Sequence, residues 1–459
     1  MSQAWAERRW ASEHFSGVRG DARLVRRLVA MASQAARRPA GLVTQVFRTS
    51  AEREAAFRLL ENRRLSAAEM ARATHDAVAG QCGQQEVYVA LDGSSLSLTE
   101  RTARRELGGV GAWKDFGRGL LVASALAVTG RGVPVGICGQ RFWAREAPTT
   151  KRIKNHRSMQ TETRHGVELL EQVHARLQAC GALPWYQLDR GFDAWPILQR
   201  ACHGKMRLTV RAVGSRLVVD SLGRRKLLRD VAGRARLLGH YDLEVRATAT
   251  RPARTARMRL RCATVTVPLA VGKRRREDVR LQLVHVQEIS SDPQRLVWML
   301  LTTVAVDSRE DALRVVRGYT MRWRIEDFHR AWKQGLCRVE DSQLRSREAL
   351  TRWATLLSAV AARATRLAHL ARQADDSAPA TDEFSRDEIN AIVALREPKG
   401  LRLGVTPSLK QAIRWVADLG GYTGKSSGGP PGATVIGRGL ADVEVLVRGL
   451  NNLRRMESG

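Results

Sequence analysis

The sequence predicts an α/β protein with helical segments at both ends. Between residues 86 and 303, short runs rich in valine, leucine and alanine are typical of buried strands. Before residue 76 and after residue 343, apolar residues recur with a helical period. Two of the predicted strands are each followed by an aspartate, and the carboxyl ends of strands are where α/β proteins place their ligands.

The composition indicates a folded protein with a polyanionic partner. The chain has 459 residues, of which 44% are hydrophobic and 27% are charged, enough for several domains with their own cores. The 77 Lys and Arg residues outnumber the 46 Asp and Glu residues, which gives a net charge of +31. Because the basic residues run along the whole chain, we expect nucleic acid as the partner.

Cysteine usage and hydropathy indicate a cytoplasmic protein with no membrane partner. The six cysteines are scattered and form no Cys-x-x-Cys pair, which disfavours a structural zinc site and fits reduced thiols. The first residues lack the apolar core of a signal peptide, and no apolar run approaches the length of a membrane span.

Residues 1–75 are predicted to be a basic helical domain. Two capping boxes mark helix starts, one at Thr49 with Glu52 and one at Ser66 with Glu69. The recurrent arginines favour a DNA-binding unit, and a solvated charged face is the alternative.

Two of the strands predicted for the following region lead to aspartates. The run 86–91 precedes Asp92, and the run 185–188 precedes Asp189. The runs 120–128 and 133–138 add two strands joined by a short turn, so we expect an antiparallel meander. A surface aspartate that caps a helix is the alternative, and it could apply to Asp92 or to Asp193.

The rest of the chain divides by composition. Residues 215–298 alternate with period two and carry outward arginines, which predicts a strand-rich, positively charged insertion. Residues 371–385 are polar and contain proline, as linkers do. The segment 386–459 is predicted to be a helical C-terminal domain.

Residues 319–333 are predicted to form one amphipathic helix with a polar face. On a helical wheel, Tyr319, Arg322, Glu326 and Lys333 fall within roughly 60° of one another. The opposite side carries an apolar stripe: Met321, Ile325, Phe328 and Trp332. An ordinary surface helix is the alternative, but two strand-end aspartates elsewhere favour a third functional carboxylate at Glu326.

Three carboxylates suit hard cations such as Mg²⁺ or Mn²⁺. Two such ions about 3.5–4 Å apart can activate a water or a 3′-hydroxyl for phosphoryl transfer. Acid–base catalysis by a carboxylate pair, as in glycosidases, is the rival chemistry. Arg322 and Lys333 favour phosphoryl transfer, because a neutral sugar gives these cations no role.

This set of residues resembles the DDE transposases of the bacterial insertion-sequence-four family. The motif consists of Asp92, Asp189 and the signature Tyr319-x2-Arg322-x3-Glu326-x6-Lys333. Similarity also includes the sequence around Trp298 and the segments 54–62 and 409–416, so it covers nearly the whole chain.

The resemblance implies a ribonuclease-H-like catalytic core at 76–371 that contains the 215–298 insertion. It implies that residues 1–75 recognise the inverted-repeat ends of a transposon and that 386–459 support a homodimer. The implied reaction is cut-and-paste transposition through a DNA hairpin into target DNA, with two Mg²⁺ or Mn²⁺ ions per active site.

The resemblance also implies roles for individual residues. Asp92, Asp189 and Glu326 would be the catalytic metal ligands. Tyr319, Arg322 and Lys333 would hold phosphates near the cleaved end. Trp298 would stack on a base flipped from the duplex, with a core residue on an apolar strand as the alternative.

Two other functions remain open. One is a structure-specific nuclease without strand transfer, and the other is an inactive DNA-binding relic of an insertion element. No position of the acidic triad or of the signature is substituted, which disfavours the relic.

Overall fold

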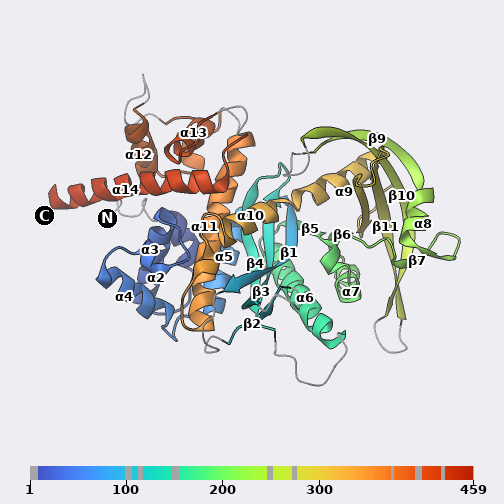
Figure 1. The fold of residues 1–459 in the computed structure, drawn as a ribbon, viewed down its shortest axis with the longest axis horizontal. Coiled ribbons are helices and arrows are strands. Elements are labelled where there is room, and N and C mark those ends of the chain that lie inside the picture. Colours follow the sequence, from blue (N-terminus) through green and yellow to red (C-terminus); the bar gives the residue numbers. More distant parts are fainter. Residues whose placement is uncertain are drawn as a thin grey trace. The chain divides into compact units, whose positions relative to one another are not determined.

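A computed structural model of the chain describes residues 9–98, 106–111, 117–145, 156–245, 252–270, 276–373, 377–397, 406–424 and 429–457. The chain forms two compact units (Figure 1). Unit 1 comprises Met1–Gly83, Ser94–Thr150 and Arg324–Gly459, and unit 2 comprises Gln84–Gly93 and Lys151–Trp323. The range expected for the catalytic domain, 76–371, is therefore divided between the two units.

Unit 2 is built on a mixed sheet. Its strand order is β1-β5-β6-β12-β11-β10-β7-β8, and β9 pairs with β10. The strands are β1 (Glu86–Leu98), β5 (Leu183–Leu188), β6 (Arg207–Arg211), β7 (Leu217–Val219), β8 (Arg225–Leu227), β9 (Arg236–Val245), β10 (Arg254–Ala270), β11 (Arg276–Glu288) and β12 (Val297–Thr302). Neighbours β1, β5 and β6 run parallel, whereas β12 joins β6 antiparallel. The predicted α/β class is confirmed.

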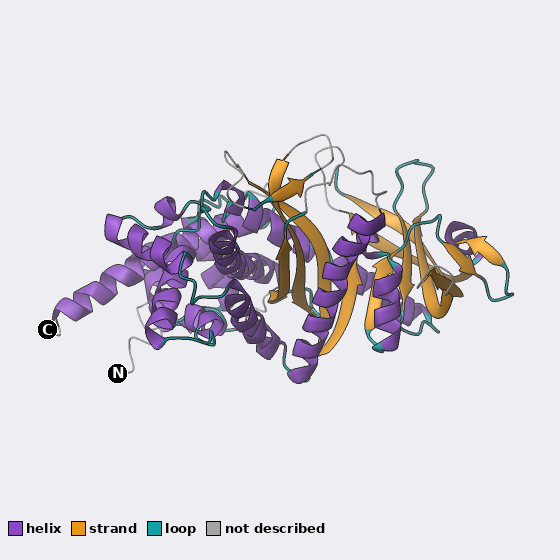
Figure 2. Cartoon of the chain, turned by 90° about the horizontal axis from the view of Figure 1, so that it is seen from below, coloured by secondary structure: helices purple, strands orange, loops and turns teal. Residues whose placement is uncertain are grey.

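Helices in unit 2 pack along this sheet (Figure 2). They are α6 (His156–Ala179), α7 (Trp195–His203), α8 (Leu228–Arg234) and α9 (Arg309–Met321), with a 3-10 turn, η3, at Arg190–Phe192. Gly318 lets α9 approach the sheet, because a Cβ there would lie 2.8 Å from Cε1 of Tyr88. Glycine is therefore needed where the last turns of α9 meet the strand that carries Asp92.

The predicted strand-rich character of residues 215–298 is confirmed. Strands β10 and β11 pair antiparallel from Met258 opposite Glu288 to Ala270 opposite Arg276. On β10, buried Met258 and Leu260 alternate with more exposed arginines, as the period-two pattern predicted.

Unit 1 holds a smaller sheet with the strand order β2-β3-β1, and β4 pairs with β3. Its own strands are β2 (Gly108–Val110), β3 (Gly117–Thr129) and β4 (Pro134–Trp143). The predicted turn between β3 and β4 is confirmed: the Gly132 N–H donates to the Thr129 carbonyl at 2.8 Å, and Gly132 has a φ of 85°. Glycine adopts this left-handed conformation without strain.

The prediction that the first strand ends at Asp92 is wrong, because β1 continues to Leu98. Leu96 and Leu98 are buried while Ser97 is exposed, so the residues after Gly93 keep a period of two. As a result, β1 belongs to unit 2 up to Gly93 and to unit 1 from Ser94.

Helices make up most of unit 1. They are α1 (Arg9–Phe15), α2 (Ala22–Arg37), α3 (Val43–Val46), α4 (Ser50–Leu60), α5 (Ala67–Cys82), α10 (Arg324–Lys333), α11 (Arg347–Gln373), α12 (Arg386–Arg396), α13 (Leu409–Leu419) and α14 (Ala433–Glu457). Two 3-10 turns, η4 (Val339–Asp341) and η5 (Ala380–Asp382), lie between them. Helix α11 is buried along most of its length and forms the core of this unit.

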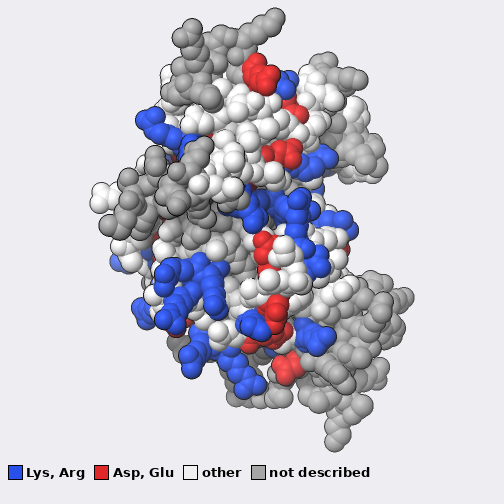
Figure 3. Space-filling view, turned by 90° about the vertical axis from the view of Figure 1, so that its left-hand side faces the viewer, with Lys and Arg blue, Asp and Glu red and all other residues white. Residues whose placement is uncertain are grey.

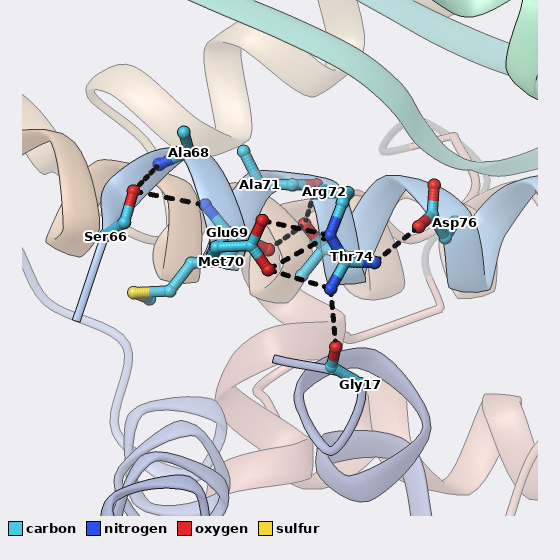
Figure 4. A network of polar contacts seen from close by, with 9 residues as sticks. All are labelled: Gly17, Ser66, Ala68, Glu69, Met70, Ala71, Arg72, Thr74 and Asp76. Carbon is cyan, nitrogen blue, oxygen red and sulfur yellow. Dashed lines mark hydrogen bonds and ion pairs between the residues drawn. The ribbon is translucent and has the colours of Figure 1, made fainter. Parts of the chain in front are cut away.

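One of the two predicted N-terminal capping boxes is complete. Thr49 and Glu52 close the box at the start of α4. At α5, Ser66 accepts the N–H groups of Ala68 and Glu69, but the Glu69 carboxylate turns to Arg72 instead (Figure 4). The hydrogen bonds from the Arg72 guanidinium to the Glu69 carboxylate are charge-assisted, so they are stronger than a bond from the backbone N–H of Ser66.

The described part of the predicted linker packs against the protein. Ala380 and Phe384 are buried in a cluster with Leu367 of α11 and with Ile413 and Ile436 of the C-terminal helices. A free polar linker was therefore the wrong expectation for residues 377–385. The C-terminal helices share a core with α11.

Candidate active site and nucleic-acid interface

Two of the predicted carboxylates lie at matching positions on adjacent parallel strands of unit 2. Leu91 of β1 is in register with Leu188 of β5, and Asp92 and Asp189 follow these two residues. Neighbouring strands are about 4.8 Å apart, and both aspartates are half-buried. Asp92 lies within β1, so the helix-cap alternative does not account for it. Asp189 precedes η3 but makes no capping hydrogen bond with its side chain.

A buried arginine stands beside the first carboxylate. The Nη1 atom of Arg322 lies 3.7 Å from Oδ2 of Asp92, and the Arg322 side chain is 7% exposed. The other oxygen of Asp92 accepts the N–H of Gly93 at 2.9 Å. Arg322 thus supplies positive charge at the carboxylates from within unit 2.

Tyr319 interacts with Arg322 and with the second aspartate, Asp189. Burial raises the pKa of the Tyr319 hydroxyl, Asp189 adds to that rise, and Arg322 and Arg211 oppose it. These four residues are therefore close enough to interact electrostatically. Arg211, on β6, is a residue that the sequence prediction missed, although an arginine near the end of an apolar strand that follows Asp189 could have suggested it.

Trp298 packs on Tyr319. The two ring centroids are 5.6 Å apart with an interplanar angle of 62°, an edge-to-face arrangement. Trp298 is half-buried on β12, so one part of the indole packs against the protein and another part is accessible.

The prediction of one continuous helix over 319–333 is wrong. Helix α9 ends at Met321 and α10 begins at Arg324. The N–H groups of Arg322 and Trp323 donate to the carbonyls three residues earlier, those of Tyr319 and Thr320. This tighter turn ends the α-helical pattern, and the compact units also divide there, between Trp323 and Arg324.

The signature residues are consequently distributed over two units. Tyr319 and Arg322 lie in unit 2 with Asp92, Asp189 and Trp298, whereas Glu326 and Lys333 lie in unit 1 on α10. The helical-wheel prediction that all four signature residues share one face therefore applies only to residues of the same helix.

Helix α10 is fixed within unit 1 by the predicted apolar stripe. Ile325, Phe328 and Trp332 are buried, and the Phe328 and Trp332 rings stack at 5.7 Å. The Trp332 indole N–H donates to the Ala354 carbonyl of α11 at 3.0 Å. This packing determines the direction in which α10 presents Glu326.

A contact between a histidine of α11 and an aspartate of α10 also anchors α10. Nε2 of His369 on α11 lies 3.2 Å from Oδ2 of Asp327, the residue after Glu326. Burial lowers the pKa of His369. Burial also acts to raise the pKa of Asp327, but His369 and nearby arginines outweigh that effect and hold it below its usual value. Both pKa shifts are consistent with a neutral His369 imidazole that donates a hydrogen bond to an ionised Asp327 carboxylate.

Lys333 belongs to a polar group that the sequence prediction also missed. Its Nζ donates to Oγ of Ser94 at 3.3 Å and lies 3.6 Å from Glu340. Glu340 in turn accepts the backbone N–H of Ser97 at 2.9 Å. No local pattern links Glu340 to β1, because the two are joined only by the fold.

The donor chemistry at the paired aspartates suits a hard divalent cation. Asp92 and Asp189 offer carboxylate oxygens on adjacent strands, the ligand type that Mg²⁺ and Mn²⁺ prefer. Within the described parts of the chain, no three His, Cys, Asp or Glu side chains are grouped closely enough to hold a metal ion. The structure thus brings two of the three predicted ligands together.

The N-terminal helices of unit 1 present a basic surface. Residues 1–65 contain 13 arginines and no lysine against six acidic residues, a balance of 13 − 6 = +7. On α2, Leu24 and Leu28 are buried while Arg23, Arg26 and Arg27 are exposed. Figure 3 shows Lys and Arg side chains gathered on the face that carries the N- and C-terminal helices.

Comparison with known families gives a match for the N-terminal region and a match for the region that contains Asp189 and Glu326. Residues 2–65 match the family model described as transposase DNA-binding, and residues 157–362 match the model described as transposase DDE domain. The chain is a DDE transposase. The DDE match contains Asp189, Glu326 and the rest of the signature, while Asp92 precedes it.

As a DDE transposase, the protein is a metal-dependent enzyme that cleaves DNA. The expected ribonuclease-H-like fold is confirmed for its catalytic domain, in keeping with the mixed sheet and flanking helices. DNA is a partner of the transposase through its N-terminal region. No helix in the described residues is long and apolar enough to cross a bilayer.

Proposed function

We propose that this transposase belongs to the insertion-sequence-four family, whose best-known member is the transposon-five transposase, and moves DNA by cut and paste. It cuts at inverted-repeat ends, passes through a hairpin on the transposon end, and joins the 3′-hydroxyl to target DNA. The observation that carries the proposal is that Asp92 and Asp189 directly follow paired residues of two adjacent parallel strands, with Arg322 beside Asp92.

Asp92, Asp189 and Glu326 are the proposed ligands of two divalent ions, Mg²⁺ or Mn²⁺. When bound, such ions lower the pKa of the attacking water or 3′-hydroxyl and stabilise the leaving oxygen. The carboxylates orient these ions, and the packing of Trp332 against α11 fixes the helix that carries Glu326.

Four further residues hold the DNA near the reacting phosphate. Arg322 and Lys333 pair with phosphate oxygens, because a guanidinium and an ammonium retain their charge beside a polyanion. The Tyr319 hydroxyl donates to a phosphate, and burial favours its protonated form. Trp298 stacks on a flipped base with the accessible part of its indole.

The proposed assembly is a homodimer that pairs two transposon ends in the bacterial cytoplasm, where its DNA substrate lies. Residues 1–75 recognise the ends, the 76–371 segment catalyses the reaction, and 386–459 support dimerisation. The basic N-terminal helices support the first of these roles.

The test is a reaction with inverted-repeat DNA, Mg²⁺ and a supercoiled target plasmid. We expect cleaved ends and products joined to the plasmid, and we expect Glu326→Gln and Asp189→Asn to abolish both. Glu310→Gln, which changes an exposed acid in the first turn of α9, is the matched control.

Three results would contradict the proposal. Cleavage without joining would identify a structure-specific nuclease. Binding without cleavage in the wild-type protein would identify an inactive relic. Unchanged cleavage by Glu326→Gln would refute the assignment of the third carboxylate.

A further inference from the structure

A groove in unit 1 is lined by four arginines from opposite ends of the chain. It has a volume of about 750 Å³ and lies where the loop after α2, helices α3 and α4, the turn after α10 and helix α14 meet. Its arginines are Arg38, Arg48, Arg53 and Arg438. None of the described residues that line it is acidic.

The N-terminal wall of the groove carries three of these arginines. Arg38 is the C-cap residue of α2, while Arg48 and Arg53 flank the start of α4. Arg48 is exposed, and the Nε of Arg53 donates to the Phe47 carbonyl at 2.9 Å. That bond fixes the Arg53 side chain.

The opposite wall is one face of α14. Thr434, Gly437, Arg438 and Ala441 line the groove, at intervals of three, four and seven residues from the first. This spacing places them on the same side of a helix. Arg438 is exposed, whereas Gly437 is buried.

Close packing and ion pairs hold α14 against the N-terminal helices. A Cβ at Gly437 would lie 2.3 Å from Cδ1 of Leu336, so the absence of a side chain lets α14 reach the turn after α10. Arg37 pairs with Glu444, and Arg448 lies 3.5 Å from Glu52. The groove is therefore a built feature of unit 1.

Two carboxylates on the helices that line the groove, Glu52 of α4 and Glu444 of α14, are already engaged. Glu52 accepts the backbone N–H groups of Arg48 and Thr49, and Glu444 pairs with Arg37. Four arginines thus line a groove whose described lining contains no acidic residue, which favours an anionic ligand. The volume exceeds that of one phosphate, and guanidinium groups bind phosphate oxygens in a bidentate manner.

We propose that this groove binds consecutive backbone phosphates of one DNA segment and that Arg438 of α14 is part of the DNA-binding surface. Arg38, Arg48 and Arg53 lie within the region that matches the transposase DNA-binding model, which identifies DNA as the polyanion. The inference rests on the proposed function for the identity of that DNA. It gives the C-terminal helix a direct contact with substrate in addition to any role in dimerisation.

The test measures the affinity of full-length protein for an inverted-repeat duplex by fluorescence anisotropy over a range of NaCl concentrations, without a divalent metal. We expect Arg438→Ala to weaken binding about tenfold and to reduce the slope of log K against log salt by about one, because one phosphate contact is lost. Arg438→Lys should retain most of the affinity, and Arg438→Glu should lose more than the alanine variant.

Arg454→Ala is the matched control, because Arg454 is an exposed arginine on the same helix that lies 3.3 Å from Asp387 and outside the groove. Thermal unfolding of each variant separates a folding defect from a lost contact. Wild-type affinity and slope in Arg438→Ala would refute the proposal. An effect on inorganic phosphate binding alone would also refute it and would identify a small-anion site.

The result is independent of the catalytic assignment, because the measurement can be made in Glu326→Gln protein. If Arg438→Ala weakens binding while wild-type protein forms no joined product, the groove is supported and the proposed function fails. If joining occurs normally and Arg438→Ala binds as wild type does, the groove proposal fails by itself.

Discussion

At the scale of single residues, Trp298 has two explanations that one experiment separates. Its ring packs on Tyr319, yet the indole is half-buried. A stacking role predicts that Trp298→Ala slows hairpin formation while Trp298→Phe retains much of the rate, since base stacking contributes about 1–3 kcal/mol.

The measurement is single-turnover hairpin formation, with 2-aminopurine fluorescence to report base flipping. Thermal unfolding of the same variants is the control. If Trp298→Ala lowers the unfolding temperature and leaves flipping unchanged, Trp298 is a core residue and the stacking role is wrong.

The residues that the sequence could predict are those with a local pattern. Asp92 and Asp189 follow apolar strand runs, and the structure places the residues before them, Leu91 and Leu188, in register. Glu340 has no such signal, because its partners lie on other elements that the fold brings together. Tertiary contacts of this kind are not encoded within a window of neighbouring residues.

At the scale of secondary-structure elements, the break between α9 and α10 was not predictable from residue types. The segment 319–333 contains neither glycine nor proline, so nothing in it marks a helix end. The exposed Trp323 occupies the turn, and the buried stripe of α10 packs on α11. The packing of each helix within its own unit determines where the helical pattern stops.

The N-cap of α9 gives an element-scale prediction. Oγ of Ser308 accepts the N–H of Asp311 at 3.1 Å and closes a capping box. Ser308→Ala should lower the free energy of unfolding by about 1 kcal/mol, the usual cost of losing a serine cap. Urea denaturation followed by circular dichroism measures this change.

Ser221→Ala, a substitution in an exposed turn, is the control for the cap variant. If both variants unfold at the same urea concentration, the box contributes nothing measurable to the stability of α9.

At the scale of the whole molecule, buried histidines make stability depend on pH. Burial lowers the pKa of His14, His174, His285 and His369 below the ordinary value of 6.5. The unfolded chain therefore binds protons at a pH where the folded chain does not. Because the unfolded state holds more protons in this range, stability falls as pH decreases below about 6.5.

His285 provides the test of this prediction. It is buried on β11, and its Nδ1 lies 3.1 Å from the Ala232 carbonyl. The unfolding temperature of wild-type protein should fall between about pH 7.5 and pH 5.5, and His285→Gln should show a smaller fall. The exposed His203, changed to Gln, is the control. A pH-independent unfolding temperature in the wild type would contradict the prediction.

The order in which the chain passes between the two units has a consequence for truncated forms of the protein. The chain enters unit 2 at Gln84, leaves it at Gly93, returns at Lys151 and leaves again at Trp323. A frameshift or stop codon between these points leaves neither unit complete. A stop just after Trp323 preserves unit 2 with both aspartates but deletes Glu326. Under the proposed assignment of Glu326, a copy that stops between these points lacks the third metal ligand, so we expect it not to cleave DNA.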